Sequence, residues 1–376
     1  MTAERLFPRA GDARFMDAAI RLARRHEGWT ATNPSVACLL VRDEGDGPLV
    51  VGAGVTAQGG RPHAEPLALE QAGDRARGAT AYVTLEPCAH HGRTPPCAQT
   101  LISAGVARVV TAVVDPDPRV NEKGHAMLRA AGIAVEAGLG ADEARQGLAG
   151  YLSHKSRGRP LVTLKLAVSA DGLIGLRGGG QAAITGAVSR AQTHLMRARH
   201  QAILIGSGTA LADDPELTCR LAGLESRSPM RVVLDAAARV HAGLKLIATA
   251  RAVPTLVAAP RALPSQDALK QAGAEIFASE LADGRIALPE LLEDLASRGV
   301  MNLLVEGGAA VASSFLAEGL VDRIALFESP VVIGRGHAVS RHVASPIAPD
   351  SVPSGFRLTG EQRFGDDRLR MFERID

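Results

Sequence analysis

The fold of the first part of this chain is decided by the stretch Pro62-His63-Ala64-Glu65, together with Pro87-Cys88 and the later Cys97. One imidazole and two thiolates make three zinc ligands, and catalytic zinc sites use three protein ligands and keep a water in the fourth position. Zinc lowers the pKa of that water, and a carboxylate beside the metal can move protons. We therefore predict a hydrolytic zinc site with His63, Cys88 and Cys97 as metal ligands and Glu65 as the catalytic residue.

The spacing matches the His-x-Glu and Pro-Cys-x-x-Cys signature of zinc-dependent nucleobase deaminases, except that the gap between the cysteines is longer. Eight residues separate Cys88 from Cys97, and they include one glycine and two prolines, which favour a looped excursion. Two alternatives remain open at this point. One is a closed zinc site with His90, His91 or Cys38 as fourth ligand, and the other is a pair of buried thiols without metal.

Length and cysteine content indicate an intracellular enzyme of two domains. The chain has 376 residues, which is typical of two domains with separate cores. Its four cysteines do not form a disulfide framework, and in a reducing compartment they favour metal or catalytic roles. The first 25 residues carry charges throughout, and no apolar run is long enough to span a bilayer. We expect a cytoplasmic protein.

Charge and aromatic content argue against a nucleic-acid binder. The net charge is only +2 and aromatic residues make up 3% of the chain, whereas nucleic-acid binding needs a basic stripe and stacking platforms. The expected ligand is a small molecule. The expected partners are further copies of the same chain, in a homo-oligomer, with no nucleic acid and no membrane.

Apolar runs alternate with helical patterns along the first part of the chain, which predicts an α/β domain. We expect strands near 36–41, 49–51, 81–85, 108–114 and 133–136, and helices near 16–25, 63–73, 97–104, 124–131 and 142–152. This order sets the three metal ligands around helix starts that face strand ends. Open α/β sheets bind their ligands in such crevices.

A basic segment containing Gly158 and Pro160 then predicts an interdomain linker at 154–160, between domains at 1–153 and 161–376. In the second domain we expect strands at 161–168, 202–205 and 303–305. The last two run into glycine-containing turns and helix starts, which is a geometry that can hold a phosphate. Lys165 lies inside an apolar strand, where it is costly unless it is paired or lines a cleft. There is no Gly-x-Gly-x-x-Gly fingerprint, so a classical dinucleotide-binding fold is not predicted.

Over essentially its whole length, the chain resembles the bifunctional riboflavin-biosynthesis deaminase-reductases. The resemblance rests on residues 33–36, 62–65, 84–97 and 115–118 in the first domain, and on 165–172, 208–220 and 305–308 in the second. The long loop between the cysteines is the most specific of these segments. The long gap between Cys88 and Cys97 is therefore both the unusual feature of the metal motif and its most diagnostic part.

The resemblance implies a three-layer α/β domain like that of cytidine deaminases, followed by an α/β domain like dihydrofolate reductase. The first domain would use Zn²⁺ to deaminate 2,5-diamino-6-ribosylamino-4(3H)-pyrimidinone 5′-phosphate, and the second would use NADPH to reduce the ribosyl group to ribityl. Competing hypotheses are a deaminase with a reductase-like domain that only binds nucleotide or serves as an assembly surface, a deaminase of bases within RNA, and a structural zinc module.

The resemblance also implies roles for individual residues. Asn33 would orient the base, and Arg93 would meet the substrate phosphate. In the second domain, the positions that match substrate-binding positions of the family are Lys165, Arg197, Leu217, Arg220 and Glu306. The positions that match cofactor-binding positions are Ala167, Thr209, Asp213, Gly308, Ala309, Ala310, Val311, Ala312, Ser313 and Ser314.

The chain departs from the family in two places. Gln181-Ala182-Ala183 stands where the family usually has Ser-x-Trp, so a substrate-contacting hydroxyl and a cofactor-contacting aromatic ring are both absent. Thr56 stands where the family often has a histidine. These departures concern contacts to substrate and cofactor, and they leave the metal motif intact.

Overall fold

The structure is a computed structural model that describes residues 11–92, 94–178, 182–261 and 265–375. The chain forms two compact units, Met1–Gly158 and Arg159–Asp376. Helix α5 (Ala141–Arg157) ends at Gly158, which has a φ of 67°. Residues 154–157 were predicted to lie in a linker, but they form the last turn of this helix. Basic side chains are favourable at a helix C-terminus and glycine is favourable just after it, so 154–157 close the helix, whereas the boundary between the two units, after Gly158, lies within the predicted linker.

The first unit contains a sheet with the strand order β2-β1-β3-β4-β5. Strand β1 is antiparallel to both of its neighbours, β2 and β3, whereas β3, β4 and β5 run parallel to one another. Its strands are β1 (Ala37–Asp43), β2 (Pro48–Val55), β3 (Thr80–Leu85), β4 (Arg108–Val113) and β5 (Ala134–Ala137). Each of the five strands predicted for this part of the chain is confirmed, with its ends shifted by a few residues.

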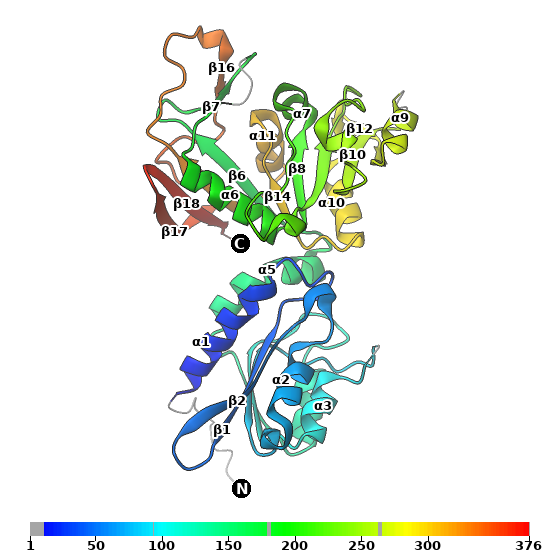
Figure 1. Cartoon of the computed structure of the whole chain (residues 1–376), viewed down its shortest axis with the longest axis vertical. Coiled ribbons are helices and arrows are strands. Elements are labelled where there is room, and N and C mark those ends of the chain that lie inside the picture. Colours follow the sequence, from blue (N-terminus) through cyan, green and yellow to red (C-terminus); the bar gives the residue numbers. More distant parts are fainter. Residues whose placement is uncertain (1–10, 93, 179–181, 262–264, 376) are drawn as a thin grey trace. The chain divides into compact units, whose positions relative to one another are not determined.

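Helices cover both faces of this sheet and make the three layers that were predicted (Figure 1). On one face α1 (Asp12–Ala23) lies beside α5, and on the other α2 (Ala64–Ala72), α3 (Cys97–Ser103) and α4 (Lys123–Ala130) pack in sequence. Helix α2 approaches β2 closely because Gly52 and Gly54 have no Cβ. A Cβ at either position would overlap a backbone carbonyl oxygen of α2. These glycines therefore set the position of the helix that carries Glu65.

The second unit contains a larger sheet with the order β11-β10-β9-β8-β14-β6-β15-β18-β17. The strands from β11 to β15 run parallel, and β18 and β17 add an antiparallel hairpin at the edge. The strands are β6 (Leu161–Val168), β8 (Ala202–Gly206), β9 (Met230–Leu234), β10 (Thr255–Pro260), β11 (Glu275–Ser279), β14 (Asn302–Val305), β15 (Arg323–Glu328), β17 (Phe356–Phe364) and β18 (Asp367–Arg374). The predicted strands are β6, β8 and β14, and they are neighbours in the centre of the sheet.

Helices cover both faces of this sheet as well, and alternate residues of β8 enter opposite cores. Ala202 and Leu204 pack with α10 (Leu288–Ser297) and α11 (Ala309–Ala317), whereas Ile203 and Ile205 pack on the face of α6 (Ala187–Arg199). The remaining helices are α7 (Ser207–Asp213), α8 (Lys245–Ala248) and α9 (Gln266–Gln271). Two small ribbons pair β7 (Leu173–Leu176) with β16 (His342–Ala344) and β12 (Leu281–Ala282) with β13 (Arg285–Ile286).

Single 3₁₀ turns connect several of these elements, namely η1 (Arg24–His26), η2 (Gln58–Gly60), η3 (Gly73–Ala76), η4 (Glu225–Arg227) and η5 (Val339–Arg341). Within the described residues, no helix is long and apolar enough to cross a membrane.

Candidate active sites

The predicted metal ligands meet where two helices begin beside a strand end. His63 is the N-cap of α2, Cys88 follows β3, and Cys97 is the first residue of α3. The His63 Nδ1 atom lies 3.3 Å from the Cys97 Sγ and 3.8 Å from the Cys88 Sγ. All three candidate ligand atoms lie within 4.8 Å of one another. Two sulfurs and one imidazole nitrogen at this spacing fit a tetrahedral zinc ion with one position left for water.

The alternative of a closed metal site needs a fourth protein ligand. In the part of the chain that the structure describes, the metal-ligating cluster contains the three predicted residues and does not include His90, His91 or Cys38. Cys38 is fully buried near the start of β1, and burial raises the pKa of its thiol. It behaves as a core residue. The geometry therefore favours an open site.

Glu65 lies in the first turn of α2 and is only 3% exposed. Burial and the neighbouring Cys88 raise its pKa to about 7. The pKa of Cys88 is lowered to about 4, because Cys97 and His63 donate hydrogen bonds to its sulfur. The cluster thus combines a thiol that ionises readily with a carboxyl group that can hold or release a proton near neutral pH.

A cavity of about 440 Å³ opens next to this cluster. Its lining includes His63, Glu65 and Cys88, and the predicted base-orienting residue Asn33 lies on its wall. Thr56 also lines it, and its hydroxyl accepts a hydrogen bond from the backbone N–H of Val36 at 3.0 Å. Arg93, predicted to meet the substrate phosphate, lies outside the described residues. The residues predicted for the first reaction, apart from Arg93, are therefore grouped around one cavity or its metal cluster.

Tyr151 and Lys155 of α5 also line this cavity, and no sequence motif pointed to them. The Tyr151 hydroxyl donates to both carboxylate oxygens of Asp115, at 2.9 and 3.0 Å. The Lys155 Nζ lies 3.1 Å from Asp117. These contacts join α5 to the loop that follows β4. The segment 115–118 was quoted among the family motifs, but the assignment of Lys155 to a linker hid its partner.

Glu86 is a second missed residue, and it organises the same loop from the end of β3. Its buried carboxylate accepts hydrogen bonds from the backbone N–H groups of Asp115, Glu122, Gly124 and His125, at 3.0 to 3.3 Å. A carboxylate with several such donors is strongly held. Glu86 precedes Cys88 by two residues, so the same short segment after β3 carries a predicted metal ligand and holds the loop that follows β4.

In the second unit, three of the predicted substrate residues converge. Val305 pairs with Leu164 on the neighbouring parallel strand, so Glu306 and Lys165 follow at adjacent positions. From α6, the Arg197 guanidinium donates to both carboxylate oxygens of Glu306, each at 2.9 Å. Burial lowers the pKa of Lys165, while Glu306 opposes this effect. A lysine in an apolar strand is costly, and here the cost is offset because Lys165 lies in a charged cluster with Glu306 and Arg197.

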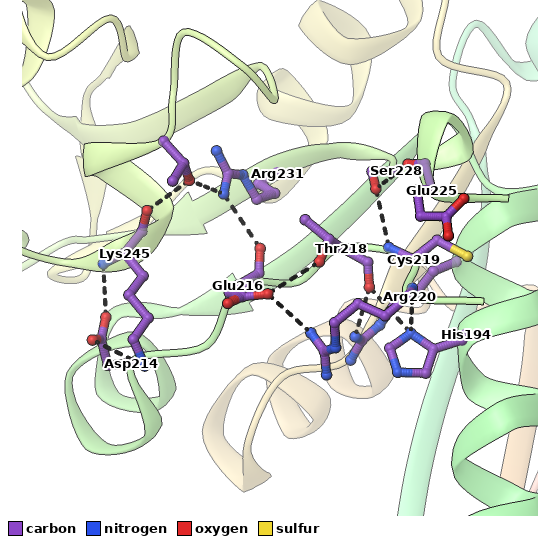
Figure 2. A network of polar contacts seen from close by, with 12 residues as sticks. His194, Asp214, Glu216, Thr218, Cys219, Arg220, Glu225, Ser228, Arg231 and Lys245 are labelled. Carbon is purple, nitrogen blue, oxygen red and sulfur yellow. Dashed lines mark hydrogen bonds and ion pairs between the residues drawn. The ribbon is translucent and has the colours of Figure 1, made fainter. Parts of the chain in front are cut away.

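The other two predicted substrate residues lie on a loop, 214–220, that joins α7 to η4. Leu217 is buried and has a φ of 56°, in the left-handed region that non-glycine residues rarely occupy. Arg220 is exposed and lies 3.4 Å from Glu216. Figure 2 shows this loop and the side chains that bind its backbone. The Thr218 carbonyl accepts a hydrogen bond from Arg197, which ties the loop to the charged cluster.

A second cavity, of about 1050 Å³, lies at the ends of β8 and β14. Most residues at the predicted cofactor positions line it, namely Thr209, Asp213, Gly308, Ala309, Ala310, Val311, Ser313 and Ser314. Ala312 does not line it, because its side chain is fully buried in the core, and Ala167 packs against the other core. Gly307 lets the start of α11 approach β14, since a Cβ there would lie 2.6 Å from the Cβ of Val311. Glycines and a helix start facing a cavity of this size fit a dinucleotide phosphate.

Comparison with known proteins decides the family. The model of the RibD C-terminal domain matches residues 160–352, and that of the cytidine and deoxycytidylate deaminase zinc-binding region matches residues 10–113. The chain belongs to the RibD family. The riboflavin biosynthesis protein RibD of Aquifex aeolicus is 38% identical over 328 residues, which cover 87% of this chain and 89% of the relative.

Solved RibD structures show the same fold. A structure of Acinetobacter baumannii RibD has a TM-score of 0.85 and 34% identity, and the match covers 98% of this chain and 99% of that one. A Thermotoga maritima diaminohydroxyphosphoribosylaminopyrimidine deaminase/5-amino-6-(5-phosphoribosylamino)uracil reductase has a TM-score of 0.83 and 32% identity, with 96% and 98% covered. The predicted family and the predicted pair of α/β domains are confirmed. As a RibD protein, the chain is a bifunctional zinc deaminase and NADPH-dependent reductase of riboflavin biosynthesis.

Exposed arginines also line the second cavity of this RibD protein, and no sequence motif pointed to them. Arg177, Arg239 and Arg285 all line it, and Arg239 donates a hydrogen bond to the Ser207 hydroxyl at 3.2 Å. They lie on three segments that are far apart in the sequence. No local pattern distinguishes them from other surface arginines, so only the folded chain could identify them.

Proposed function

We propose that the first unit deaminates 2,5-diamino-6-ribosylamino-4(3H)-pyrimidinone 5′-phosphate and that the second reduces the ribosyl group of the product to ribityl. The observation that carries the proposal is the cluster of His63, Cys88 and Cys97, open on one side, beside a cavity that also contains the buried Glu65. A closed structural zinc site needs neither an adjacent cavity nor a buried carboxyl group, which is costly to bury.

In the first reaction, His63, Cys88 and Cys97 hold the zinc ion. When bound there, zinc supplies Lewis-acid activation of a water molecule. Glu65 accepts a proton from the attacking water and delivers it to the ring nitrogen. It then takes the remaining proton of the added hydroxyl and gives it to the amino group, which leaves as ammonia. Asn33, on the cavity wall, orients the base by hydrogen bonds from its side-chain amide. The buried position of Glu65 restricts competing proton exchange with bulk water.

In the second reaction, Lys165, Arg197 and Glu306 bind the substrate at the end of the sheet, with Leu217 and Arg220 on the loop beside them. NADPH supplies the hydride. The residues of 308–314 that line the cavity, together with Thr209 and Asp213, would hold the cofactor, and the backbone N–H groups at the start of α11 would be available to its phosphates. We assign the proton transfer to the sugar oxygen to Lys165, which lies beside Glu306 and Arg197 and whose pKa is lowered by burial.

The cellular location and the oligomeric state of the enzyme are also part of this proposal. A small phosphoribosylated pyrimidine is the substrate of the family, and an intermediate of biosynthesis with a charged phosphate does not leave the cell readily. We place the protein in the cytoplasm as a homo-oligomer. Gel filtration with light scattering tests the oligomer, and a monomer at working concentration contradicts it.

The test of both reactions is one incubation of metal-analysed protein with the diamino substrate, with and without NADPH, following ammonia and NADPH absorbance together. We expect ammonia release in both samples and NADPH oxidation only after deamination. Ammonia release without any NADPH oxidation would support the alternative in which the second unit only binds nucleotide. No ammonia release from zinc-loaded protein would contradict the deaminase.

The role of Glu65 is tested separately with Glu65→Gln. We expect zinc to remain bound and ammonia release to fall by about 10² to 10⁴, the usual contribution of a general acid–base group. Glu70→Gln is the matched control, because Glu70 is exposed on the same helix. Undiminished turnover in Glu65→Gln would rule out the proton-transfer role.

A further inference from the structure

Arg231 is the largest fully buried side chain in the described part of the chain, and neither proposed reaction uses it. It lies near the start of β9 and is 0% exposed. Its guanidinium donates to the carbonyl of Glu216 at 3.3 Å, to the hydroxyl of Thr249 at 2.8 Å and to the carbonyl of Val253 at 2.6 Å. These acceptors are all neutral, and burial lowers the pKa of Arg231 to about 10.

A buried cation with neutral acceptors is costly, so its geometry calls for a physical reason. The guanidinium joins two places that are distant in sequence. On one side is the segment 249–253 after α8, and on the other is the backbone of the substrate loop 214–220. The planar fork of arginine can reach both at once, whereas a lysine ammonium is a single point charge.

The loop at this contact has an unfavourable backbone conformation. Asp214 has a φ of 39° and Leu217 a φ of 56°, and Glu216, whose carbonyl Arg231 binds, lies between them. Non-glycine residues in this region persist only where their surroundings hold them. Such a loop needs external anchors on its backbone.

The other anchors lie on either side of the Arg231 contact, as Figure 2 shows. The Asp214 carboxylate accepts a hydrogen bond from the backbone N–H of Lys245 at 2.8 Å. Beyond Leu217, the N–H of Cys219 donates to Ser228 at 3.1 Å, and that of Arg220 donates to His194 at 3.3 Å. Between these anchors, the hydrogen bond from the Arg231 guanidinium holds the carbonyl of Glu216, the residue directly before Leu217.

We propose that Arg231 is a positioning residue of the reductase, whose buried guanidinium holds the Glu216 carbonyl and thereby the strained loop that presents Leu217 and Arg220 to the substrate. The functional part of this statement rests on the proposed function, which gives those two residues to the substrate. Arg231 acts through the loop and touches neither substrate nor cofactor.

The experiment compares Arg231→Lys and Arg231→Met with Thr249→Val in the full-length chain. Thr249→Val is the matched control, because it removes a second acceptor of the same guanidinium and leaves the Glu216 carbonyl and Arg231 in place. Two readouts are measured: hydrogen exchange of backbone amides in 214–220, and the reductase kinetics with NADPH and the deaminated pyrimidine. Ammonia release measures the amount of active protein in each sample.

We expect both arginine variants to exchange faster at 214–220 and to raise the KM for the pyrimidine about tenfold, the equivalent of one hydrogen bond to a charged group. The KM for NADPH should change less than about twofold, a small fraction of that effect. Thr249→Val should resemble the wild type in both readouts. Arg231→Lys keeps the charge, so it remains informative if Arg231→Met fails to fold.

The proposal is overturned if exchange at 214–220 is unchanged in Arg231→Lys, if Thr249→Val reproduces the effects of Arg231→Lys, or if the KM for the pyrimidine stays constant while exchange increases. Absence of NADPH oxidation in the wild type would contradict the proposed function instead. The exchange data would still decide whether Arg231 anchors the loop, because they need no substrate.

Discussion

Glu306→Gln is expected to destabilise the second unit by removing the negative charge between Arg197 and Lys165. The Arg197 and Glu306 side chains are 13% and 10% exposed, and two hydrogen bonds join them. Burial alone would raise the pKa of Glu306, but Arg197 and then Lys165 lower it from 4.5 to about 2. The charged form is therefore strongly favoured in the folded state.

The magnitude follows from that change in pKa. The fall from 4.5 to about 2, at about 1.36 kcal/mol per pH unit, corresponds to about 3 kcal/mol of stability. Because the folded-state pKa of Glu306 is depressed, this contribution is complete above pH 4.5 and is lost as the pH falls toward 2. We expect Glu306→Gln to lower the unfolding free energy of the second unit by about 3 kcal/mol at pH 7, and by less than half of that at about pH 3.

The assay is urea unfolding at several pH values with two signals. Trp29, Tyr82 and Tyr151 are the only tryptophan and tyrosines of the chain, and all lie in the first unit, so their fluorescence reports that unit. Far-ultraviolet circular dichroism reports both units. Glu361→Gln is the matched control, because Glu361 is exposed on β17 of the same sheet.

We expect Glu306→Gln to shift the dichroism transition and leave the fluorescence transition in place. A difference from the wild type below about 1 kcal/mol at pH 7 would refute the reasoning, since breaking a buried pair normally costs more. A difference that does not shrink toward acid pH would also refute it, because the lost contribution would then not come from the charge of Glu306.

Three further outcomes are expected. Gly54→Ala places a Cβ against the carbonyl oxygen of Ala64, so α2 must shift. Zinc content and ammonia release should both fall at least about tenfold, while NADPH oxidation on deaminated substrate remains, and unchanged zinc content would contradict this. Cys97→Ser removes a sulfur ligand, so metal analysis after dialysis should find at least about tenfold less zinc, and full retention would exclude Cys97 as a ligand. Asp12→Asn breaks a pair with Arg108 in which both side chains are 3% exposed, so urea unfolding followed by fluorescence should show a loss of about 3 to 5 kcal/mol, and an unshifted midpoint would contradict it.

The first unit could be predicted well from its sequence because its signals are local. Alternation and helical periodicity placed β1 to β5 and α1 to α5 to within a few residues, except that α5 continues to Arg157. The metal ligands follow directly from helix starts and strand ends. In the second unit, the strands predicted were the apolar run after Pro160 and the two that are followed by glycines, whereas β9, β10, β11, β15, β17 and β18 were not assigned. Short apolar runs without such punctuation give an ambiguous signal.

The amino-acid sequence by itself determined the predicted metal donor set, the expected position of Glu65 next to it, and the family that the long cysteine loop indicates. The tertiary structure alone decided which charges meet: Arg197 with Glu306, 109 positions apart, and Arg108 with Asp12, 96 apart. It also placed Arg231 beneath the substrate loop. The physical reason is that residue spacing sets geometry only within a helix, strand or turn. Contacts between distant segments depend on the order and register of the strands and on which face of the sheet each helix covers.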